Sequence, residues 1–550
     1  MRRAAVTVEK AHGVHYTPPE LGRFLAGRLL DHFPSTVRAD LTVLDPACGD
    51  GELLLAVGRA LHARGGRCRL TGYDRDPAAV ALARRRLAGA LPAVPRTLAA
   101  VDFVALSAER GAADPRFDVI VANPPYVRTQ VLGAPRARLL ADHFGLTGRI
   151  DLYQVFAAAF GRLLTDDGVL GLVTSNRFLS TRAGAGMRAR LAREYAVRQV
   201  IDLGDTRLFR AAVLPALVFA RRDPRGSPAV PLLTIYQDRA PGAATAVDSV
   251  YAALAAGASG RYAVDGRTYR VDRGTLPLAG HADRPWVSAE EHADFLAAVD
   301  RAAPLRFRDL GRIRVGVKTS ADGVFIRADW ADLPADQRPE PALRRPLISA
   351  PAAGRWRCAP GAATILYPYE MDRSRRTPVD LAGHPGAARY LAAHRARLAA
   401  RRYVVESGRH WWEIWVPQRP AEWAQPKIVF PDISETARFA VDRSGAVVNG
   451  NCYWIPFGPA QEDLALLAVA VANSAVAHRY YDARFGNRLY AGRRRYITQY
   501  VSEFPLPDPG SPHARRAVAL ARALTEGAPR DPAAVEAAAD EAVARAFGLG

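Results

Sequence analysis

The sequence has few of the features that mark a secreted, membrane-bound or metal-dependent protein. Its four cysteines are scattered without a CxxC pair, so neither a zinc site nor a disulfide framework is predicted. It contains no run of about 20 apolar residues that could span a membrane. The start, MRRAAVTVEKAHG, has no apolar run after its arginines and does not resemble a secretory signal. These absences predict a soluble, cytoplasmic protein that has no membrane partner and holds no metal.

The composition instead describes a large globular chain with a strong excess of positive charge. Its 550 residues are 49% hydrophobic, which is enough to bury the cores of two or three domains, and no internal repeat is visible. The formal net charge is +20, supplied mostly by arginine. Such a charge favours a polyanion as partner, with nucleic acid first and an anionic membrane second. A GC-rich codon bias, which the abundant alanine supports, explains the arginines equally well.

Alternating strand and helix patterns fill the first 235 residues and predict a mostly parallel sheet covered on both faces. Helix patterns run from Pro18 to about Leu30 and from Pro77 to about Ala90. Residues 236–300 are interpreted as a connector with some strand content, 301–510 as a second, α+β domain, and 511–550 as a helical tail. The expected strands are 41–45, 69–74, 117–122, 168–174, 198–203 and 214–220.

The strongest chemical motif is Asn123-Pro124-Pro125-Tyr126, which directly follows the apolar strand FDVIVA. Ligands of open α/β sheets bind beyond the carboxyl ends of strands. The prolines stiffen the loop and remove two amide donors, so carbonyl oxygens remain available. Two acceptors, the Asn123 side chain and a proline carbonyl, could hold both hydrogens of a ring-conjugated amine, and Tyr126 could stack on that ring. A structural Pro-Pro turn is the alternative.

Three further motifs lie in the same half of the chain, two of them at the ends of expected strands. Asp45-Pro46-Ala47-Cys48-Gly49-Asp50-Gly51 combines a carboxylate, which suits an ammonium or sulfonium, with glycines that permit close backbone approach. Its spacing is not GxGxxG, so a dinucleotide is not favoured. Asp74 could bind two ribose hydroxyls, and Asp102-Phe103 could hold an adenine. The first of these motifs is a moderate signal alone and the other two are weak, but the order of all four makes coincidence improbable.

On these motifs the sequence resembles the TaqI-like family of N6-adenine DNA methyltransferases, over nearly its whole length. The stretch HYTPPELGRFL (15–25) is similar to the family's motif before the first strand, and LGDTRLFRAAVLPALVF (203–219) is similar to a later one. The resemblance implies a Rossmann-like fold that binds S-adenosylmethionine, followed by a DNA target-recognition domain. It implies these cofactor contacts: Thr17, Asp45, Ala47, Gly49, Asp74, Asp102, Phe103 and Pro125. It also implies that Asn123 and Pro124 hold the target amine, while Tyr126 and Phe209 stack on a flipped base.

The second domain resembles the family's target-recognition region in four stretches. These are IRVGVKTSADGVFI (313–326), YLAAHRARLAAR (390–401), HWWEIW (410–415) and YAGRRRYITQYVSEFPLP (490–507). Arginine suits both phosphates and guanine edges, although a solvated basic helix face is the alternative. The arginines expected to contact DNA are Arg484, Arg488, Arg493, Arg494 and Arg495.

The expected activity is therefore methyl transfer to the N6 amine of adenine in double-stranded DNA, by a monomer. Some relatives fuse an endonuclease ahead of the methylase, but here the first methylase motif begins by residue 15. No carboxylate–lysine nuclease motif follows, so any restriction endonuclease is expected to be a separate protein. Two alternatives stay open: another planar nitrogen as acceptor (N4 of cytosine, an RNA base or a protein glutamine), or a DNA-specificity protein without catalysis.

Overall fold

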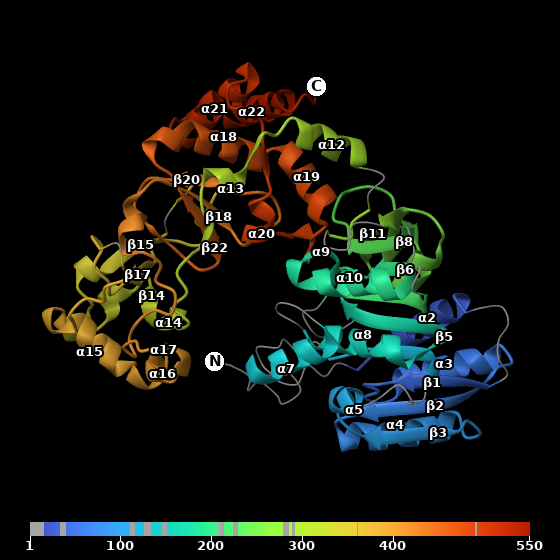
Figure 1. Ribbon diagram of the computed structural model, residues 1–550. Helices are drawn as coiled ribbons and strands as arrows, with labels where there is room; N and C mark the ends of the chain where they lie inside the picture. Colours follow the sequence, from blue (N-terminus) through green and yellow to red (C-terminus); the bar gives the residue numbers. More distant parts are fainter. Residues whose placement is uncertain are drawn as a thin grey trace. The chain divides into compact units, whose positions relative to one another are not determined.

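The structure is a computed structural model of the 550-residue chain. It describes residues 16–33, 40–109, 116–125, 134–145, 151–206, 208, 214–223, 229–278, 285–288, 292–359, 361–373, 375–489 and 492–549. Contacts divide the chain into two compact units (Figure 1). The first unit comprises Met1–His292 with Phe485–Gly492, and the second comprises Ala293–Arg484 with Arg493–Gly550.

The first unit is built on one 11-stranded sheet with the order β3-β2-β1-β4-β5-β7-β6-β8-β11-β10-β9. Neighbouring strands from β3 to β5 are parallel, and β7 lies antiparallel between β5 and β6. The carboxyl ends of the first strands therefore meet at one edge. The strands are β1 (Asp40–Asp45), β2 (Arg67–Asp74), β3 (Arg96–Ala100), β4 (Phe117–Ala122), β5 (Leu164–Ser175), β6 (Tyr195–Asp202), β7 (Pro215–Arg222), β8 (Ala229–Gln237), β9 (Thr245–Ala246), β10 (Gly260–Val264) and β11 (Arg267–Pro277).

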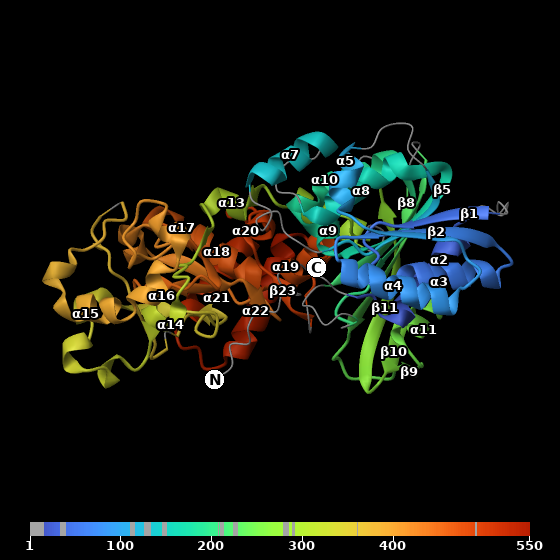
Figure 2. The ribbon, with the colours of Figure 1, turned by 90° about the horizontal axis from the view of Figure 1, so that it is seen from below.

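Helices cover both faces of this sheet (Figures 1 and 2). Successive strand residues point to opposite faces, so Val119 and Val121 join one core cluster and Ile120 and Ala122 join the other. The first cluster includes α2 (Pro19–Asp31), α3 (Glu52–Ala63), α4 (Pro77–Ala90) and α11 (Val250–Ala255). The second includes residues of α5 (Phe103–Glu109), α7 (Ala134–Phe144), α8 (Leu152–Leu163), α9 (Arg177–Ser180) and α10 (Ala185–Glu194).

The expected doubly covered α/β fold is confirmed, and the sheet extends further than expected. Strand β3 was not among the predicted strands. The stretch 236–300, interpreted as a connector, contains β10 and β11, which join the sheet through β8. A tight Asp265-Gly266 turn links β10 to β11, with φ of 47° and 71°. That turn type matches the twist of a two-stranded hairpin, so these residues continue the first unit.

The second unit is α+β, as expected, and has several small sheets around an aromatic-rich core. Its larger sheets have the orders β13-β22-β18-β20-β16 and β14-β17-β15-β21. The strands are β12 (Leu305–Arg306), β13 (Arg314–Val315), β14 (Ile326–Arg327), β15 (Arg344–Ile348), β16 (Trp356–Arg357), β17 (Thr364–Leu366), β18 (Lys427–Pro431), β19 (Ile433–Ser434), β20 (Ala440–Asp442), β21 (Val447–Val448), β22 (Cys452–Pro456), β23 (Arg494–Arg495) and β24 (Pro505–Leu506).

Short helices surround these sheets, and α18 is the most deeply buried of them, with nine consecutive buried residues from Ala465 to Asn473. The helices are α12 (Ala293–Arg301), α13 (Phe307–Leu310), α14 (Asp322–Phe325), α15 (Pro385–Ala393), α16 (Arg395–Ala399), α17 (Arg402–Val405), α18 (Glu462–Asn473), α19 (Ala475–Phe485), α20 (Thr498–Val501), α21 (Pro512–Thr525) and α22 (Pro532–Ala546).

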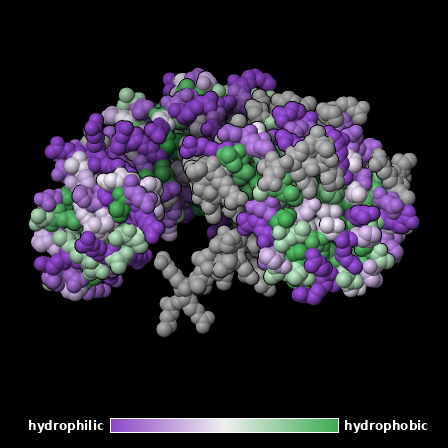
Figure 3. All heavy atoms as spheres, turned by 60° about the horizontal axis from the view of Figure 1, so that its bottom comes forward, coloured by the Kyte–Doolittle hydropathy of each residue, from purple (hydrophilic) through white to green (hydrophobic). Residues whose placement is uncertain are grey.

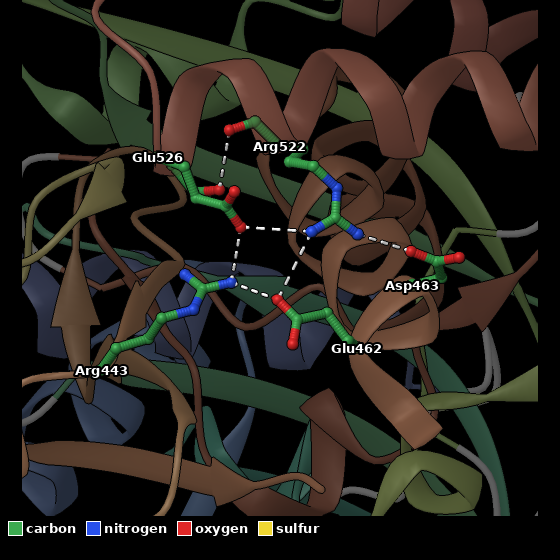
Figure 4. Close-up of polar contacts among 6 residues, drawn as sticks. Arg443, Glu462, Asp463, Arg522 and Glu526 are labelled. Carbon is green, nitrogen blue, oxygen red and sulfur yellow. Dashed lines mark hydrogen bonds and ion pairs between the residues drawn. The ribbon is translucent and has the colours of Figure 1, made fainter. Parts of the chain in front are cut away.

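The last two helices pack on α18, and α21 is also tied to it by a network of charges (Figure 4). Arg522 of α21 lies 2.7 Å from Asp463 of α18, and Arg443 lies 2.8 Å from Glu526. Arg443 and Arg522 also both pair with Glu462 of α18, so the two arginines share a carboxylate. Because each charge has several partners, the network fixes the helical tail to the second unit better than an isolated surface pair would.

Hydrophilic residues predominate on the face shown in Figure 3, which is consistent with the high arginine content. Within the described ranges, no single helix has the length and apolar content needed to cross a membrane. The bent pair Pro459–Asn473 and Ala475–Phe485 reaches those values by length and composition alone.

Candidate active site

Four of the polar residues singled out in the sequence lie at the ends of four neighbouring strands. Asp45 ends β1 and Asp74 ends β2, while Asp102 and Asn123 follow the ends of β3 and β4. The strand order β3-β2-β1-β4 makes these ends adjacent, and the parallel register pairs Asp45 with Gly72. The fold therefore brings all four motifs to one edge of the sheet, where ligands of such sheets bind.

Asp45 is a buried carboxylate whose charge is not balanced by a nearby cation in the described part of the chain. Its side chain is 1% exposed and accepts one hydrogen bond, from the backbone N–H of Ala47 at 3.1 Å. Burial raises the pKa of Asp45 to about 8, and the nearby Asp74 contributes in the same direction. A cationic ligand would stabilise the ionised form, so this position suits an ammonium or a sulfonium.

The loop after β1 is held against the end of β2 by backbone contacts. The N–H of Gly49 donates to Asp74 Oδ2 at 2.9 Å, and Asp74 Oδ1 accepts from the N–H of Asp76 at the same distance. Gly49 and Gly51 have φ of 50° and 82°, a region that favours glycine. A Cβ at Gly49 would lie 3.4 Å from the ring of Tyr16. Tyr16 adjoins Thr17 in the HYTPPE motif but was not selected from the sequence.

The Asp102-Phe103 motif combines a partly exposed carboxylate with a buried ring. Asp102 accepts a hydrogen bond from the N–H of Val104 at 3.0 Å and so begins α5. Phe103 is 2% exposed and packs on Phe156, with 5.1 Å between ring centroids. Half-buried Tyr73, which precedes Asp74, stacks on Phe103 at 6.5 Å. Tyr73 is thus a second aromatic beside the predicted adenine site that the sequence did not single out.

Asn123 is hydrogen-bonded to Thr17, which lies 106 positions earlier in the sequence. Its Nδ2 donates to the hydroxyl of Thr17 at 3.1 Å. This bond orients the amide so that Oδ1 lies at the end away from Thr17. Pro124 is buried and Pro125 is half-buried. Tyr126 and Phe209, the two expected base-stacking residues, lie outside the described residues.

A second polar cluster lies at the same sheet edge and was missed in the sequence. Asp202, the last residue of β6, accepts hydrogen bonds from Tyr236 Oη at 2.6 Å, Asn176 Nδ2 at 3.1 Å and the Gly204 N–H at 3.0 Å. Burial raises the pKa of Asp202, although these bonds oppose the shift. The same search for acidic strand ends that selected Asp74 could have found Asp202. The cluster fixes the backbone that directly follows β6.

The five arginines expected to contact DNA have different surroundings. Arg494 is 8% exposed, forms two 2.7 Å contacts with Asp482, and also donates to the Glu435 carbonyl. Arg495 pairs with Asp432 at 3.1 Å. Arg493 of the same run is exposed.

The other two arginines of the set are partly buried. Arg484 lies 3.6 Å from Asp300. Arg488 belongs by its contacts to the first unit, where its charge opposes the rise in the pKa of Asp202. Arg484, Arg494 and Arg495 therefore have internal acidic partners in the second unit, and Arg493 is the arginine of the run that faces solvent.

The fold and this sheet edge define an S-adenosylmethionine-dependent methyltransferase. The donor set fits that cofactor, because a buried, uncompensated carboxylate suits its cationic methionine end and an acidic side chain at the end of the second strand, as Asp74 is, can accept hydrogen bonds from ribose hydroxyls. Within the described ranges, no group of three or more His, Cys, Asp or Glu residues could hold a metal ion.

Comparisons with known proteins agree with this class and specify it further. Residues 69–209 match the family model of the Eco57I restriction-modification methylase, and residues 384–506 match the TaqI-like C-terminal specificity domain. The Type II methyltransferase M.BanIII of Aneurinibacillus aneurinilyticus is 36% identical over 96% of this chain and 95% of its own length. The chain therefore belongs to the Type II DNA methyltransferases of restriction-modification systems.

More distant relatives match a large part of the chain. The Type II methyltransferase M.XhoI of Xanthomonas vasicola is 28% identical over 71% of this chain and 68% of its own length. Among solved structures, the DrdV–DNA complex superimposes with a TM-score of 0.55 at 13% identity, over 94% of this chain and 57% of that chain. This likeness shows a common fold that spans both units.

Proposed function

We propose that this methyltransferase acts on the N6 amine of adenine in double-stranded DNA, after flipping the base out of the duplex. The observation that supports transfer to an exocyclic amine best is the Thr17–Asn123 hydrogen bond, and the choice of adenine rests on the family resemblance. It links the residue expected to contact the cofactor with the residue expected to hold the acceptor. A single rigid contact would then set the distance between the two reactants, and correct positioning is worth many kcal/mol in such a transfer.

The acceptor nitrogen is a poor nucleophile because its lone pair is delocalised into the ring. Asn123 Oδ1 and the Pro124 carbonyl act as two hydrogen-bond acceptors for the two N–H groups. Holding both hydrogens favours a pyramidal nitrogen whose lone pair is directed at the methyl group. S-adenosylmethionine would supply that methyl group from its sulfonium, so the N–C bond would form as the S–C bond breaks, the neutral thioether would leave, one amine proton would pass to solvent, and no covalent enzyme adduct would be needed.

The cofactor residues have complementary roles in this proposal. Asp45 neutralises the cationic methionine end, with Ala47 and Gly49 giving the backbone close access. Asp74 accepts hydrogen bonds from the ribose hydroxyls, and Asp102 and Phe103 contact the adenine ring of the cofactor. Thr17 borders the methionine end of the cofactor, and Pro125 borders its methyl group.

Base flipping follows from access, because pairing and stacking shield the amine inside a duplex. Tyr126 stacks on one face of the flipped ring and Phe209 on the other, which offsets part of the cost of unstacking. A 2-aminopurine at the target position tests this step, since its fluorescence rises on unstacking. Tyr126→Ala and Phe209→Ala should each lower turnover and brighten the bound analogue, whereas unchanged rates and fluorescence would argue against stacking.

The biological role proposed is protection of host DNA from a separately encoded restriction endonuclease that cuts the same sequence. The exposed Arg493 contributes to DNA affinity through phosphate contacts, and Arg484 and Arg488 lie in the same stretch of sequence. Genomic DNA from cells that express the chain should resist cleavage by endonucleases of one sequence specificity and stay sensitive to endonucleases of other specificities.

The acceptor can be identified by incubating plasmid DNA with S-adenosylmethionine labelled on its methyl group and then digesting the DNA to nucleosides. The proposal predicts label in N6-methyladenine alone. Label in N4-methylcytosine would change the acceptor, and label in RNA or protein but not in DNA would refute the proposal. The Asn123→Ala variant serves as the negative control, because it should bind the cofactor without transferring the methyl group.

A further inference from the structure

Lysine is nearly absent from this strongly basic chain. Lys10, Lys318 and Lys427 are the three lysines among 75 basic Lys and Arg residues. Arginine supplies the positive charge at nearly every basic position, as it would under the codon bias that is one explanation of the composition. Arginine and lysine are not interchangeable where a compact ammonium is required. The positions that keep lysine therefore mark places where the shape of the cation matters. Lys10 lies outside the described residues.

Lys427 illustrates such a requirement in the interior. Its side chain is fully buried and its Nζ lies 2.8 Å from Asp442. The same Nζ donates to the Trp423 carbonyl at 2.8 Å and lies 3.4 Å from the Gln425 carbonyl. Three acceptors converge on one nitrogen, which matches the three donors of an ammonium and not the planar fork of a guanidinium. Lysine at this position thus has a clear geometric reason.

Lys318 lies in the opposite environment, on the surface of the second unit. Its side chain is exposed, whereas the adjacent Val317 and Thr319 are 2% and 0% exposed. Within the described residues it forms neither an ion pair nor a side-chain hydrogen bond. No partner among the described residues therefore explains why lysine is kept, which favours a partner outside the chain as the reason for an ammonium here.

The backbone beneath Lys318 is held on both sides. Its N–H and carbonyl both form 3.0 Å hydrogen bonds with Val416. On the other side, a Cβ at Gly316 would lie 2.0 Å from the Asn449 carbonyl oxygen. A Cβ at Gly450 would lie 2.9 Å from Lys318 Cγ. Both glycines are thus needed for the close approach of neighbouring segments. Lys318 is presented by a rigid platform, which limits where its ammonium can reach.

Backbone strain is concentrated around the same platform. Ser320 and Gln418 have φ of 58° and 67°, in the left-handed region that non-glycine residues rarely adopt. Each lies two residues beyond one member of the Lys318–Val416 pair. The Gln418 side chain donates to the Val315 carbonyl at 2.7 Å and so helps to maintain its conformation. Strained backbone of this kind tends to cluster at functional sites.

We propose that Lys318 reads a guanine in the recognised DNA sequence, by donating to the O6 and N7 atoms on its major-groove edge. This inference rests on the proposed action on double-stranded DNA. Lysine is one of the side chains whose geometry matches that pair of acceptors. A phosphate contact would tolerate arginine and a mobile loop, whereas a base edge met at a fixed distance distinguishes a compact ammonium from a guanidinium.

The experiment selects duplexes from a random DNA library with the full-length protein and sequences the bound fraction. Wild-type protein should enrich a sequence that contains guanine at a fixed position. Lys318→Met should lose preference at that guanine alone, with affinity for the wild-type sequence reduced about 10-fold to 100-fold. Lys318→Arg, which keeps the charge, should also weaken that preference. Arg516→Met removes an exposed charge on α21 and should change neither quantity.

Three outcomes would overturn the assignment. The first is an unchanged guanine preference in both Lys318 variants. The second is uniform weakening on all duplexes, with the slope of log affinity against log salt concentration lowered by about 0.9, as loss of a phosphate contact would give. The third is no sequence preference in the wild-type protein. Unfolding midpoints and cofactor binding equal to wild type verify that each variant is folded. Because the readout is binding, the identity of the methylated atom is a separate question. If cytosine is the acceptor, the proposed function fails while the role of Lys318 stands.

Discussion

Two buried carboxylates, Asp442 in the second unit and Asp45 in the first, have opposite surroundings. Asp442 lies 2.8 Å from the fully buried Lys427, and the half-buried Asp482 of the same unit likewise forms two 2.7 Å contacts with Arg494. In the first unit, Asp45 is equally buried but accepts only a backbone hydrogen bond, and burial raises its pKa to about 8. Leaving a buried carboxylate without a counterion lowers the stability of the empty protein.

This contrast separates charges that build the fold from charges that bind ligands. A paired buried charge is satisfied by the folded chain itself, so its loss damages the structure. An unpaired one is satisfied only when a ligand brings the opposite charge, so its loss damages binding and can relieve the fold. The same reasoning distinguishes the exposed Lys318 and Arg493 from the internally paired Arg494.

The largest effect is expected on stability, from Lys427→Met. The variant leaves Asp442 buried without its cation, which should lower the free energy of unfolding of the second unit by about 3–5 kcal/mol. Denaturant unfolding followed by tryptophan fluorescence measures this, because the second unit is rich in buried tryptophan. A loss below about 1 kcal/mol would mean that the pair does not carry the stability assigned to it.

The next effect concerns turnover, through Asn123→Ala. Removing the acceptor for the target amine should reduce the methylation rate by about 100-fold or more, while calorimetry should find cofactor affinity within a few fold of wild type. Asn123→Asp, which keeps an acceptor oxygen, should retain more activity than the alanine variant. Equal rates for wild type and Asn123→Ala would remove Asn123 from the catalytic machinery.

A smaller effect of opposite sign is expected from Asp45→Asn. The folded-state pKa of Asp45 is raised, so ionisation lowers the stability of the empty protein as pH rises toward 8. The amide avoids this penalty and should raise the free energy of unfolding at pH 9 by about 1–3 kcal/mol. It should also weaken cofactor binding about tenfold. A variant that loses both stability and affinity would show that Asp45 is structural.

The smallest effect distinguishes neighbouring arginines. Arg493→Gln should lower the slope of log affinity against log salt concentration for DNA by about 0.9, with stability unchanged. Arg494→Gln should lower stability, because it leaves Asp482 without its ion pair. DNA-binding titrations at several salt concentrations measure the slopes. Identical slopes for wild type and Arg493→Gln would remove Arg493 from the DNA contacts.

The place of the motifs in the fold could be predicted from sequence because their signals are local. Asp45, Asp74 and Asn123 each end or follow a strand that the sequence shows, and the α/β pattern places strand ends together. The strand before Asp102 was not recognised. What was missed depends on contacts between distant residues. The Asp202 cluster requires Tyr236, 34 positions away, and the internal role of Arg494 requires Asp482.

The extent of the sheet was missed for a different reason. The stretch 260–277 alternates apolar and charged residues, as a half-exposed hairpin does, and contains the Asp265-Gly266 turn. The many glycines, prolines and polar residues around it favoured a connector. The hairpin turn was the decisive signal in this stretch. Strand β3, only five residues long, gave too short an apolar pattern to detect.

The most direct test of the contrast between the units is the proton balance of cofactor binding. If Asp45 is protonated in the empty protein and ionised beside the cofactor, binding at pH 7 should release close to one proton, because its pKa is about 8. Calorimetry with S-adenosylmethionine in buffers of different ionisation enthalpy measures this number. Release should fall toward zero above pH 9 and be absent at pH 7 in Asp45→Asn. Binding to wild-type protein without proton release at pH 7 would contradict the role assigned to Asp45.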